Sequence, residues 1–248
     1  MNKRNKNNQD LRPKTEYKTR VPSKRLNIGT DGEPLRGTPS SKMLGRYLKY
    51  YEVPIDPVHR GSLWRYHTLL REWNHDSDLT RLHSFTSMVE RHYVDCLWLP
   101  VHLIKDWPSP LLDVGTGAGL PGIVLAIQLP HIQFILAEPR PRRVEFLQHV
   151  VKDLALKNVE IFPHKVTSAS FTTPIKGCIC RAFSSIEDTL PRISGVLPKN
   201  GKMFFMKGPS VQEELEKFKS DEFVLEKEDF YTLPHTTQKR SLVILKKL

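Results

Sequence analysis

A chain of 248 residues accommodates one large domain with an appendage, and its hydrophobic content of 39% is enough for a sizeable core. The longest apolar stretches are far shorter than the roughly 18 residues of a membrane-spanning helix, and no secretory signal pattern opens the chain. Three cysteines are too few for a disulfide framework, so we expect a cytoplasmic protein without membrane contacts.

The net charge of +11 is concentrated at the start of the chain. Residues 1–25 hold nine Lys or Arg against two acidic residues, which gives +7 and leaves +4 for the remainder. Residues 1–40 are also rich in Asn, Pro, Gly and Ser without an apolar period, which predicts a disordered basic arm. We expect this arm to contact nucleic-acid phosphates. A solubilising tail and a targeting peptide are the alternatives.

Residues 41–107 are expected to form a helical cap ahead of the rest of the fold. Apolar side chains at spacings of three and four start near Lys42 and stop at Pro54, and the same spacing recurs over residues 56–74 and 84–99. Proline breaks a helix because it lacks a backbone N–H, so residues 100–110, bounded by two prolines, are a predicted connector.

From residue 108 onward, short apolar strands alternate with helical segments. The expected strands cover residues 111–114, 133–137, 159–162, 178–182 and 202–206, and the expected helices cover 121–128, 140–156, 186–196 and 211–219. This alternation predicts an α/β fold with a parallel sheet and helices on both faces. Two more strands, 223–231 and 240–246, have no helix between them and are therefore expected to be antiparallel near one edge.

The most informative motif is the sequence LLDVGTGAGLPG over residues 111–122. A strand ends on Asp113, and glycines follow at alternate positions, Gly115, Gly117 and Gly119, before Pro121 opens a helix. Glycine permits a sharp turn and close contact between backbone and ligand, and proline suits a first helical position because its missing N–H has no partner there. The motif predicts a loop that binds a nucleotide-type cofactor.

Two features favour S-adenosylmethionine over a dinucleotide, although residues 117–122 also match the weak pattern G-x-G-x-x-G. Asp113 at the strand end would repel a diphosphate but would attract the ammonium group of a methionine moiety. The antiparallel strand pair does not complete the second half of a dinucleotide-binding fold. The sequence leaves open a second role for Asp113, holding the amides of the glycine loop.

Glu138 follows the next strand, 23 residues after Gly115. A carboxylate there is placed to accept hydrogen bonds from both ribose hydroxyls of the cofactor. The alternative is a capping interaction with the helix that is expected to start at Arg140. Five parallel strands, a terminal antiparallel pair and this loop are together the architecture of class I S-adenosylmethionine-dependent methyltransferases, with a Rossmann-like sheet over residues 108–248.

Several stretches carry a more specific resemblance. In chain order they read LLREWNHDSDLT, ERHYVDCLWL, LLDVGTGAGLPGIVLAIQLP, ILAEPRPRRVEFLQHVVKDLALKNV, CRAFSS, MFFMKG and KRSLVILKK. Over about residues 60–248 the chain therefore resembles the ribosomal RNA small subunit methyltransferase G family. The resemblance implies methyl transfer from S-adenosylmethionine to the 7-position nitrogen of one guanine in small-subunit (16S) rRNA. It also implies rRNA or the assembling 30S subunit as the partner, and we expect a monomer.

The glycine loop and the resemblance together assign contacts to individual residues. Val166 and Thr167 match the pair that flanks the adenine, and Arg181 matches an arginine that faces the mouth of the active site. The expected cofactor-binding residues are Gly115, Gly117, Leu120, Glu138, Val166, Thr167 and Arg181. The basic residues expected to contact substrate RNA are Lys165, Lys207 and Arg240.

The chain departs from the family's pattern after the third strand. The family usually has Arg, then Val or Ala, then Glu, whereas this chain has Lys165, Val166 and Thr167. Lysine keeps the charge of arginine but loses its planar fork, and threonine does not replace a carboxylate. The alternative for Arg181 is a salt bridge at the strand end, and the alternative for Lys165 is a solvated loop charge.

No proton-transfer residue is expected, because the accepting nitrogen of guanine already has a free lone pair. Catalysis then rests on placement of the reacting atoms and on exclusion of water.

His92 and Asp95 have the H-x-x-D spacing of a metal pair, but no further ligand follows at a useful spacing. We therefore expect these residues to pack or cap at the glycine loop, and we expect no metal site. Cys178 and Cys180 are expected to pack in the core of a buried strand.

Two other functions are compatible with the same residues. One is a methyltransferase of the same fold that acts on another RNA or on a small molecule. The other is a non-catalytic RNA-binding protein of ribosome assembly that retains the cofactor fold. Methylation of unmodified small-subunit rRNA by the purified chain separates them.

Overall fold

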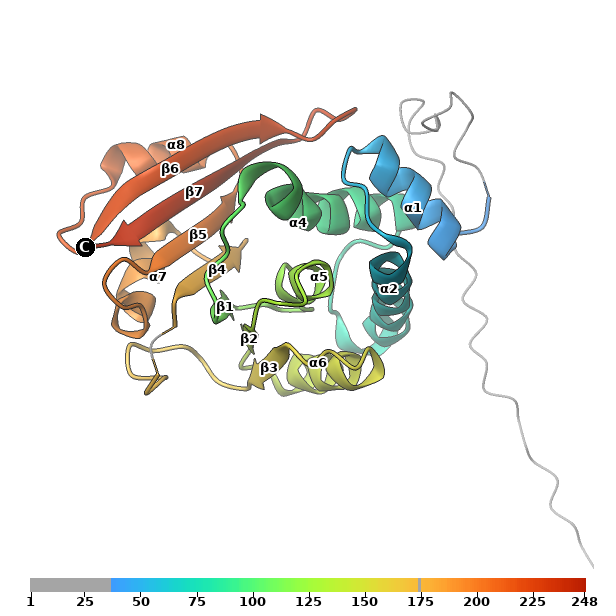
Figure 1. Cartoon of the computed structure of the whole chain (residues 1–248), viewed down its shortest axis with the longest axis horizontal. Coiled ribbons are helices and arrows are strands. Elements are labelled where there is room, and N and C mark those ends of the chain that lie inside the picture. Colours follow the sequence, from blue (N-terminus) through green and yellow to red (C-terminus); the bar gives the residue numbers. More distant parts are fainter. Residues whose placement is uncertain (1–36, 174) are drawn as a thin grey trace, which may run out of the picture.

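The computed structural model describes residues 37–173 and 175–248, which contain a seven-stranded sheet flanked by helices (Figure 1). Across the sheet the strands lie in the order β3-β2-β1-β4-β5-β7-β6. Almost all of the expected basic arm, residues 1–40, lies outside the described residues. The strands are β1 (Leu111–Val114), β2 (Phe134–Ala137), β3 (Val159–Phe162), β4 (Gly177–Arg181), β5 (Lys202–Lys207), β6 (Phe223–Thr232) and β7 (Lys239–Lys247).

The pairing of the strands confirms the predicted sheet. Strands β1 to β5 pair in parallel, and β7 runs antiparallel to both β5 and β6 at the edge. The segment between β6 and β7 is too short for a parallel crossover, which needs roughly a dozen residues or more. β4 ends at Arg181, one position before the predicted end, because Ala182 has a φ of 49° and leaves the strand.

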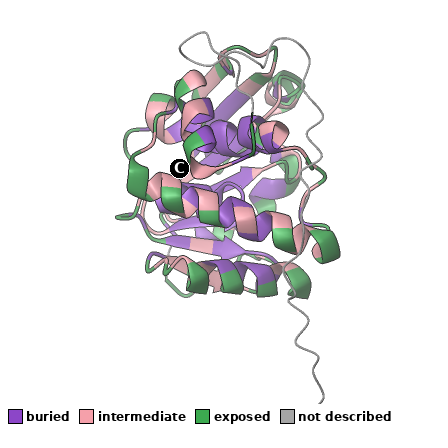
Figure 2. Cartoon of the chain, turned by 90° about the vertical axis from the view of Figure 1, so that its right-hand side faces the viewer, coloured by how far each residue is buried: buried purple, intermediate pink, exposed green. Residues whose placement is uncertain are grey.

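Both faces of the sheet are covered by helices, and alternate side chains of each strand point to opposite faces. In β1, Leu111 belongs to the apolar core under one set of helices, and Leu112 and Val114 belong to the core on the other face. Cys178 and Cys180 are fully buried in this second core, as expected. Figure 2 shows buried residues on the inward sides of the helices and exposed residues on their outward sides. The helices of this part are α5 (Gly122–Gln128), α6 (Pro141–Asp153), α7 (Ile186–Ile193) and α8 (Val211–Lys217).

The predicted cap consists of α1 (Ser41–Tyr50), α2 (Pro57–Ser77) and a third helical stretch that starts at Phe85. Side chains cap the starts of the first two helices: the Ser40 hydroxyl accepts a hydrogen bond from the Met43 N–H, and the Asp56 carboxylate accepts bonds from two amides of α2. The predicted helices at 42–53 and 56–74 are confirmed in place, with ends shifted by a few residues.

The third helical stretch is longer and less regular than predicted. It runs through α3 (Phe85–Met88), a π-helical segment Val89–Val94, α4 (Asp95–Trp98) and a second π-helical segment Leu99–Leu103. Pro100 lies at the start of the last segment, and the helical stretch continues through it although proline lacks a backbone N–H. The prediction of a connector over residues 100–110 was therefore wrong for residues 100–103.

The cap and the sheet share one hydrophobic core. Buried side chains of the cap, such as Leu44, Leu70 and Leu97, belong to the same cluster as Ile123 of α5 and Phe204 of β5. The helices of the cap lie against α5 and α6 in Figure 1. In the described part of the chain no helix is long and apolar enough to span a membrane.

A buried amide ties the end of α5 to β3. The Nδ2 of Asn158, a residue that is 6% exposed, donates to the carbonyls of Ala126 and Ile132 at 3.1 Å each and lies 3.3 Å from the carbonyl of Leu129. We predict that Asn158→Ala lowers the free energy of unfolding by about 2 kcal/mol, because buried carbonyls lose their donor. Urea denaturation measures this change. The control Gln148→Ala, at an exposed position of α6, is expected to stay within about 0.5 kcal/mol of the parent, and an equal loss in both variants would contradict the prediction.

Candidate functional site

The glycine loop connects the end of β1 to α5. Gly115, Gly117 and Gly119 have φ angles of 71°, 61° and 93°. Residues that carry a side chain rarely adopt backbone angles in this left-handed region. The alternating glycines therefore allow the chain to turn three times within five residues. The turns bring the backbone of the loop to the carboxyl end of the parallel sheet, the edge at which open α/β folds bind their ligands.

Side chains from two other elements hold the loop from beneath. The Oδ2 of Asp113 accepts hydrogen bonds from the Thr116 hydroxyl at 2.6 Å and from the Gly122 N–H at 2.8 Å. The Tyr66 hydroxyl, from α2 of the cap, donates to the Ala118 carbonyl at 2.7 Å. Asp113 and Tyr66 are both fully buried. Of the two roles that the sequence left open for Asp113, these contacts support holding the loop.

Burial changes the acidity of Asp113. Removal from water raises its pKa to about 6, while the bonds from Thr116 and Gly122 and the charge of Arg181 act in the opposite direction. The second carboxylate oxygen, Oδ1, is buried without a hydrogen-bond partner in the described structure. The loop is therefore held by a carboxylate that is poorly solvated when ionised.

Glu138 follows β2 and contacts the same loop from the other side. Its carboxylate accepts hydrogen bonds from the Gly117 N–H at 3.1 Å and from the Arg140 N–H at 3.0 Å, and Arg143 Nη1 lies 3.7 Å away. The helix α6 begins at Pro141 without a side-chain cap, so the bond to the Arg140 N–H joins Glu138 to the residue before the helix and does not cap it. Glu138 is 3% exposed. Its role in binding ribose stays a prediction.

A cavity of about 390 Å³ opens beside the loop, within the range of roughly 300–1,000 Å³ that ligand pockets occupy. It lies where the strand order reverses between β1 and β4, the usual ligand position of such sheets. Four of the predicted site residues line it: Gly115, Lys165, Val166 and Thr167. The glycine loop, the nearby acid and this cavity fit S-adenosylmethionine, whose charged methionine end and adenosine end need a backbone cradle and an apolar pocket respectively.

The other predicted site residues do not line the cavity. Leu120 is buried in the core behind the loop, and the Gly117 amide points to Glu138.

Thr167, which lines the cavity, is held by its neighbour Ser170. The N–H and the hydroxyl of Thr167 both bond to the Ser170 hydroxyl. These bonds order the segment that follows β3.

Six lining residues were not among the predicted site residues: Val114, Ala137, Pro139, His164, Phe183 and Arg192. Phe183 follows Arg181 in the stretch CRAFSS, and a phenyl group directly after a buried strand was the available signal. Arg192 belongs to α7, and its place at the cavity depends on how that helix packs. No pattern in the sequence indicates that packing.

Arg181 and Arg240 are joined by one acid of the cap. Asp95 on α4 accepts from Arg181 Nε at 2.9 Å and from Arg240 Nε at 3.1 Å. The Arg181 guanidinium also donates to the Arg91 carbonyl. Burial and the charge of Arg181 lower the pKa of His92 to about 3, so His92 is neutral beside the guanidinium. The salt bridge weighed as the alternative for Arg181 is therefore present.

Lys207 is likewise engaged within the protein. Its Nζ donates to the Ser184 carbonyl at 2.6 Å and lies 3.0 Å from both carboxylate oxygens of Glu214. Of the three residues predicted to contact RNA, Lys207 and Arg240 thus make internal ion pairs, and Lys165 is exposed at the cavity. Contact of any of them with RNA stays a prediction.

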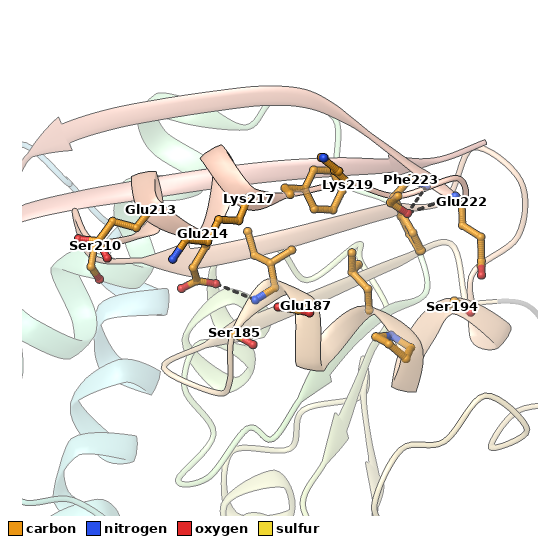
Figure 3. A pocket seen from close by; sticks show the side chains of 15 residues that line it. Ser185, Glu187, Ser194, Ser210, Glu213, Glu214, Lys217, Lys219, Glu222 and Phe223 are labelled. Atoms are coloured by element: carbon orange, nitrogen blue, oxygen red, sulfur yellow. Dashed lines mark hydrogen bonds between the residues drawn. The ribbon is translucent and has the colours of Figure 1, made fainter.

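A larger cavity, of about 730 Å³, lies between α7, α8 and the start of β6 (Figure 3). Its lining mixes acids with lysines, including Glu187, Glu213, Lys217, Lys219 and Glu222. None of the glycine-loop residues lines it. The smaller cavity is the candidate cofactor site, because only there do the loop and the ends of β1, β2, β3 and β4 meet.

The fold and this site define a class I S-adenosylmethionine-dependent methyltransferase. The solved structure of a predicted O-methyltransferase from Agrobacterium tumefaciens shares the fold, with a TM-score of 0.50 and 17% identity over 62% of this chain and 80% of that one. Among the residues that the structure describes, no group of three or more side chains is arranged to hold a metal ion.

Sequence comparison gives the family. The model of the family described as rRNA small subunit methyltransferase G (GidB) matches residues 60–243, and the chain belongs to this family. A ribosomal RNA small subunit methyltransferase G of Yersinia pseudotuberculosis is 34% identical over 83% of this chain and 98% of its own length. One named ribosomal RNA small subunit methyltransferase G 2, from Syntrophobacter fumaroxidans, is 42% identical over 85% of this chain, which spans 42% of that relative.

The raised pKa of Asp113 makes a testable contribution to stability. A carboxyl whose pKa is higher in the folded state than in the unfolded state stabilises the fold when protonated, and that stability is lost as the pH rises. We predict that, from about pH 4 to about pH 6.5, the free energy of unfolding of the parent falls by about 2–3 kcal/mol relative to Asp113→Asn. Asparagine keeps an oxygen for Thr116 and Gly122 and does not titrate.

Urea unfolding of both proteins across this pH range measures the difference. The difference is expected to level off at either end of the range, because both states of the parent are then equally protonated or equally ionised. A constant difference throughout, or a parent that gains stability relative to Asp113→Asn, would show that burial does not raise this pKa.

Proposed function

We propose that this chain transfers a methyl group from S-adenosylmethionine to the 7-position nitrogen of a guanine in small-subunit rRNA. The observation that carries the proposal is the cavity at the reversal of strand order, which Gly115, Val166 and Thr167 line. Membership of the family supports rRNA as the substrate class, and the relatives are named for the small subunit. The nitrogen that accepts the methyl group is inferred from the resemblance.

The bound cofactor would supply an electrophilic methyl group on a positively charged sulfur. In this proposal the glycine loop and Gly115 hold the methionine portion, Glu138 holds the ribose, and Val166 and Thr167 flank the adenine. The guanine nitrogen has a free lone pair, so the protein need not remove a proton. Its contribution is orientation of the reacting atoms and exclusion of water.

The substrate side of the proposal rests on charge. Lys165 is exposed at the cavity, where its ammonium group can meet an RNA phosphate. The guanidinium groups of Arg181 and Arg240 both pair with Asp95, and the two arginine side chains are 17% and 23% exposed. We propose the small-subunit rRNA or the assembling 30S subunit as partner, a monomeric protein, and a cytoplasmic reaction.

Mass spectrometry of nucleosides tests the function. Purified protein with S-adenosylmethionine is expected to produce 7-methylguanosine in small-subunit rRNA isolated from cells that lack the gene. Gly115→Val is the control: a Cβ at this position would lie 2.4 Å from Cδ2 of Phe183, and its φ of 71° is unfavourable for valine. This variant is expected to lose both cofactor binding and product.

Other outcomes identify the other functions. A different methylated nucleoside, or methylation of another RNA or a small molecule alone, would replace the proposed substrate. Tight binding of S-adenosylmethionine and of small-subunit rRNA, with no methyl transfer in any RNA, would support a non-catalytic assembly protein. Unchanged cofactor binding by Gly115→Val would contradict the site.

The basic arm generates a separate prediction about salt. Deletion of residues 1–36 leaves the Ser40 cap of α1 intact. We predict that the deletion weakens RNA binding without changing affinity for S-adenosylmethionine. The log–log salt dependence is expected to flatten by about 0.7–0.9 for each phosphate that the arm no longer neutralises. Fluorescence titrations at several salt concentrations measure both.

A variant with the sequence of residues 1–36 shuffled is the matched control for this deletion. It keeps the charge of the arm and is therefore expected to keep the slope of the parent. An unchanged slope after deletion would contradict an RNA-binding role for the arm.

A further inference from the structure

Phe183 is an exposed phenyl group at the candidate cofactor cavity. It is 38% exposed, and it belongs to neither apolar core. Within the described residues, six large apolar side chains are exposed, and Phe183 is the one that lines this cavity. An exposed aromatic ring in the wall of a ligand pocket offers a face on which a flat ligand group can pack.

The backbone holds this ring directly above the glycine loop. Ala182 has a φ of 49° and turns the chain out of β4. The turn places the Phe183 ring against Gly115: a Cβ built on Gly115 would lie 2.4 Å from Cδ2 and 2.6 Å from Cε2 of the ring. The ring thus stands at the junction of β1 and β4, the two strands that flank the reversal of strand order.

The loop that carries Phe183 is braced on its other side. Lys207 donates to the Ser184 carbonyl, and Glu214 pairs with Lys207 and accepts from the Ile186 N–H at 2.7 Å. Figure 3 shows the Glu214 carboxylate pointing from α8 toward the main chain at the start of α7. These bonds fix the backbone that follows Phe183, so the position of the ring is set by β5 and α8.

The surroundings of the ring combine an aromatic face with cationic side chains. The Arg192 guanidinium lies 5.9 Å from the ring centroid, at the limit of a cation–π contact. The ring contributes a negative π face to a cavity whose other exposed lining residues include Lys165 and Arg192. A purine attached to a phosphate matches both features, because the base stacks on a ring and the phosphate pairs with the cations.

We propose that Phe183 is the residue on which the target guanine stacks while it receives the methyl group. This inference rests on the proposed function. The lone pair of the guanine 7-position nitrogen forms a bond to the methyl carbon as the carbon–sulfur bond breaks, and the bond's electron pair stays on sulfur. The positive charge therefore moves from sulfur to the base, and a phenyl face beneath the base stabilises the charge as it develops.

Three variants test the stacking. Phe183→Leu removes the aromatic face and keeps apolar bulk, Phe183→Tyr retains the face, and Phe230→Leu removes a phenyl group that is 51% exposed on β6, away from the cavity. In steady-state methyl transfer to small-subunit rRNA, Phe183→Leu is expected to lower kcat/KM at least about fivefold, from the usual worth of base–aromatic stacking. The other two variants are expected to stay within about threefold of the parent, and all three to bind S-adenosylmethionine within about twofold of it.

A second readout does not depend on rRNA being the substrate. Isothermal titration calorimetry measures the binding of 7-methylguanosine monophosphate directly. With S-adenosylhomocysteine present, Phe183→Leu is expected to weaken the affinity for this nucleotide at least about fivefold, and Phe183→Tyr to stay within about threefold of the parent.

The outcomes separate the two proposals. A Phe183→Leu variant whose affinity for the nucleotide, or whose kcat/KM, stays within about threefold of the parent would overturn the stacking role. A parallel loss of S-adenosylmethionine affinity in Phe183→Leu would overturn it as well, because the ring would then pack on the cofactor. If Phe183→Leu weakens nucleotide binding but the parent does not methylate small-subunit rRNA, the proposed substrate is overturned and the stacking residue is retained.

Discussion

The geometry of the site depends on how a backbone loop of alternating glycines is kept in one conformation. Glycine makes the three left-handed turns possible, but it also leaves the unfolded chain with more freedom to lose. Asp113, Tyr66 and Glu138 each bond to a backbone group between Gly117 and Gly122. Because these side chains come from β1, the cap and the end of β2, the loop is specified by three separate elements.

The cap contributes to the site from two directions. Tyr66 reaches the glycine loop from α2, and Asp95 reaches the ends of β4 and β7 from α4. The Asp95 side chain is only 4% exposed and forms ion pairs with two guanidinium groups. Removing one partner of a buried ion pair leaves an uncompensated charge and is strongly destabilising. The ion pairs therefore fix the two arginines in position as well as joining the cap to the sheet.

Elements that depend on residues close together in the chain could be predicted from the sequence. The alternation of apolar strands and helices predicted the sheet, and the spacing of Gly115, Gly117 and Gly119 predicted the loop, because each depends on residues within one short segment. The helical stretch from Phe85 to Leu103 was predicted too short. Proline usually ends a helix, whereas here a π-helical segment continues through Pro100.

Ion pairs between residues far apart in the chain could not be predicted from the sequence. Arg181 and Asp95 are 86 residues apart, and Arg240 and Asp95 are 145 apart, so no local pattern pairs them. The same holds for Lys207, which the resemblance to the family assigned to the RNA side and whose bond to Ser184 spans 23 residues.

The shared core of the cap and the sheet limits how this protein can be divided. A cut at about residue 108 would strip α5 and α6 of their apolar cover and would leave the guanidinium groups of Arg181 and Arg240 without their acid. The N-terminal helices therefore share one core with the sheet, and a fragment that starts at about residue 108 is expected to be much less stable than the whole. An exchange of segments between relatives would keep these contacts only if the cap moved together with the sheet.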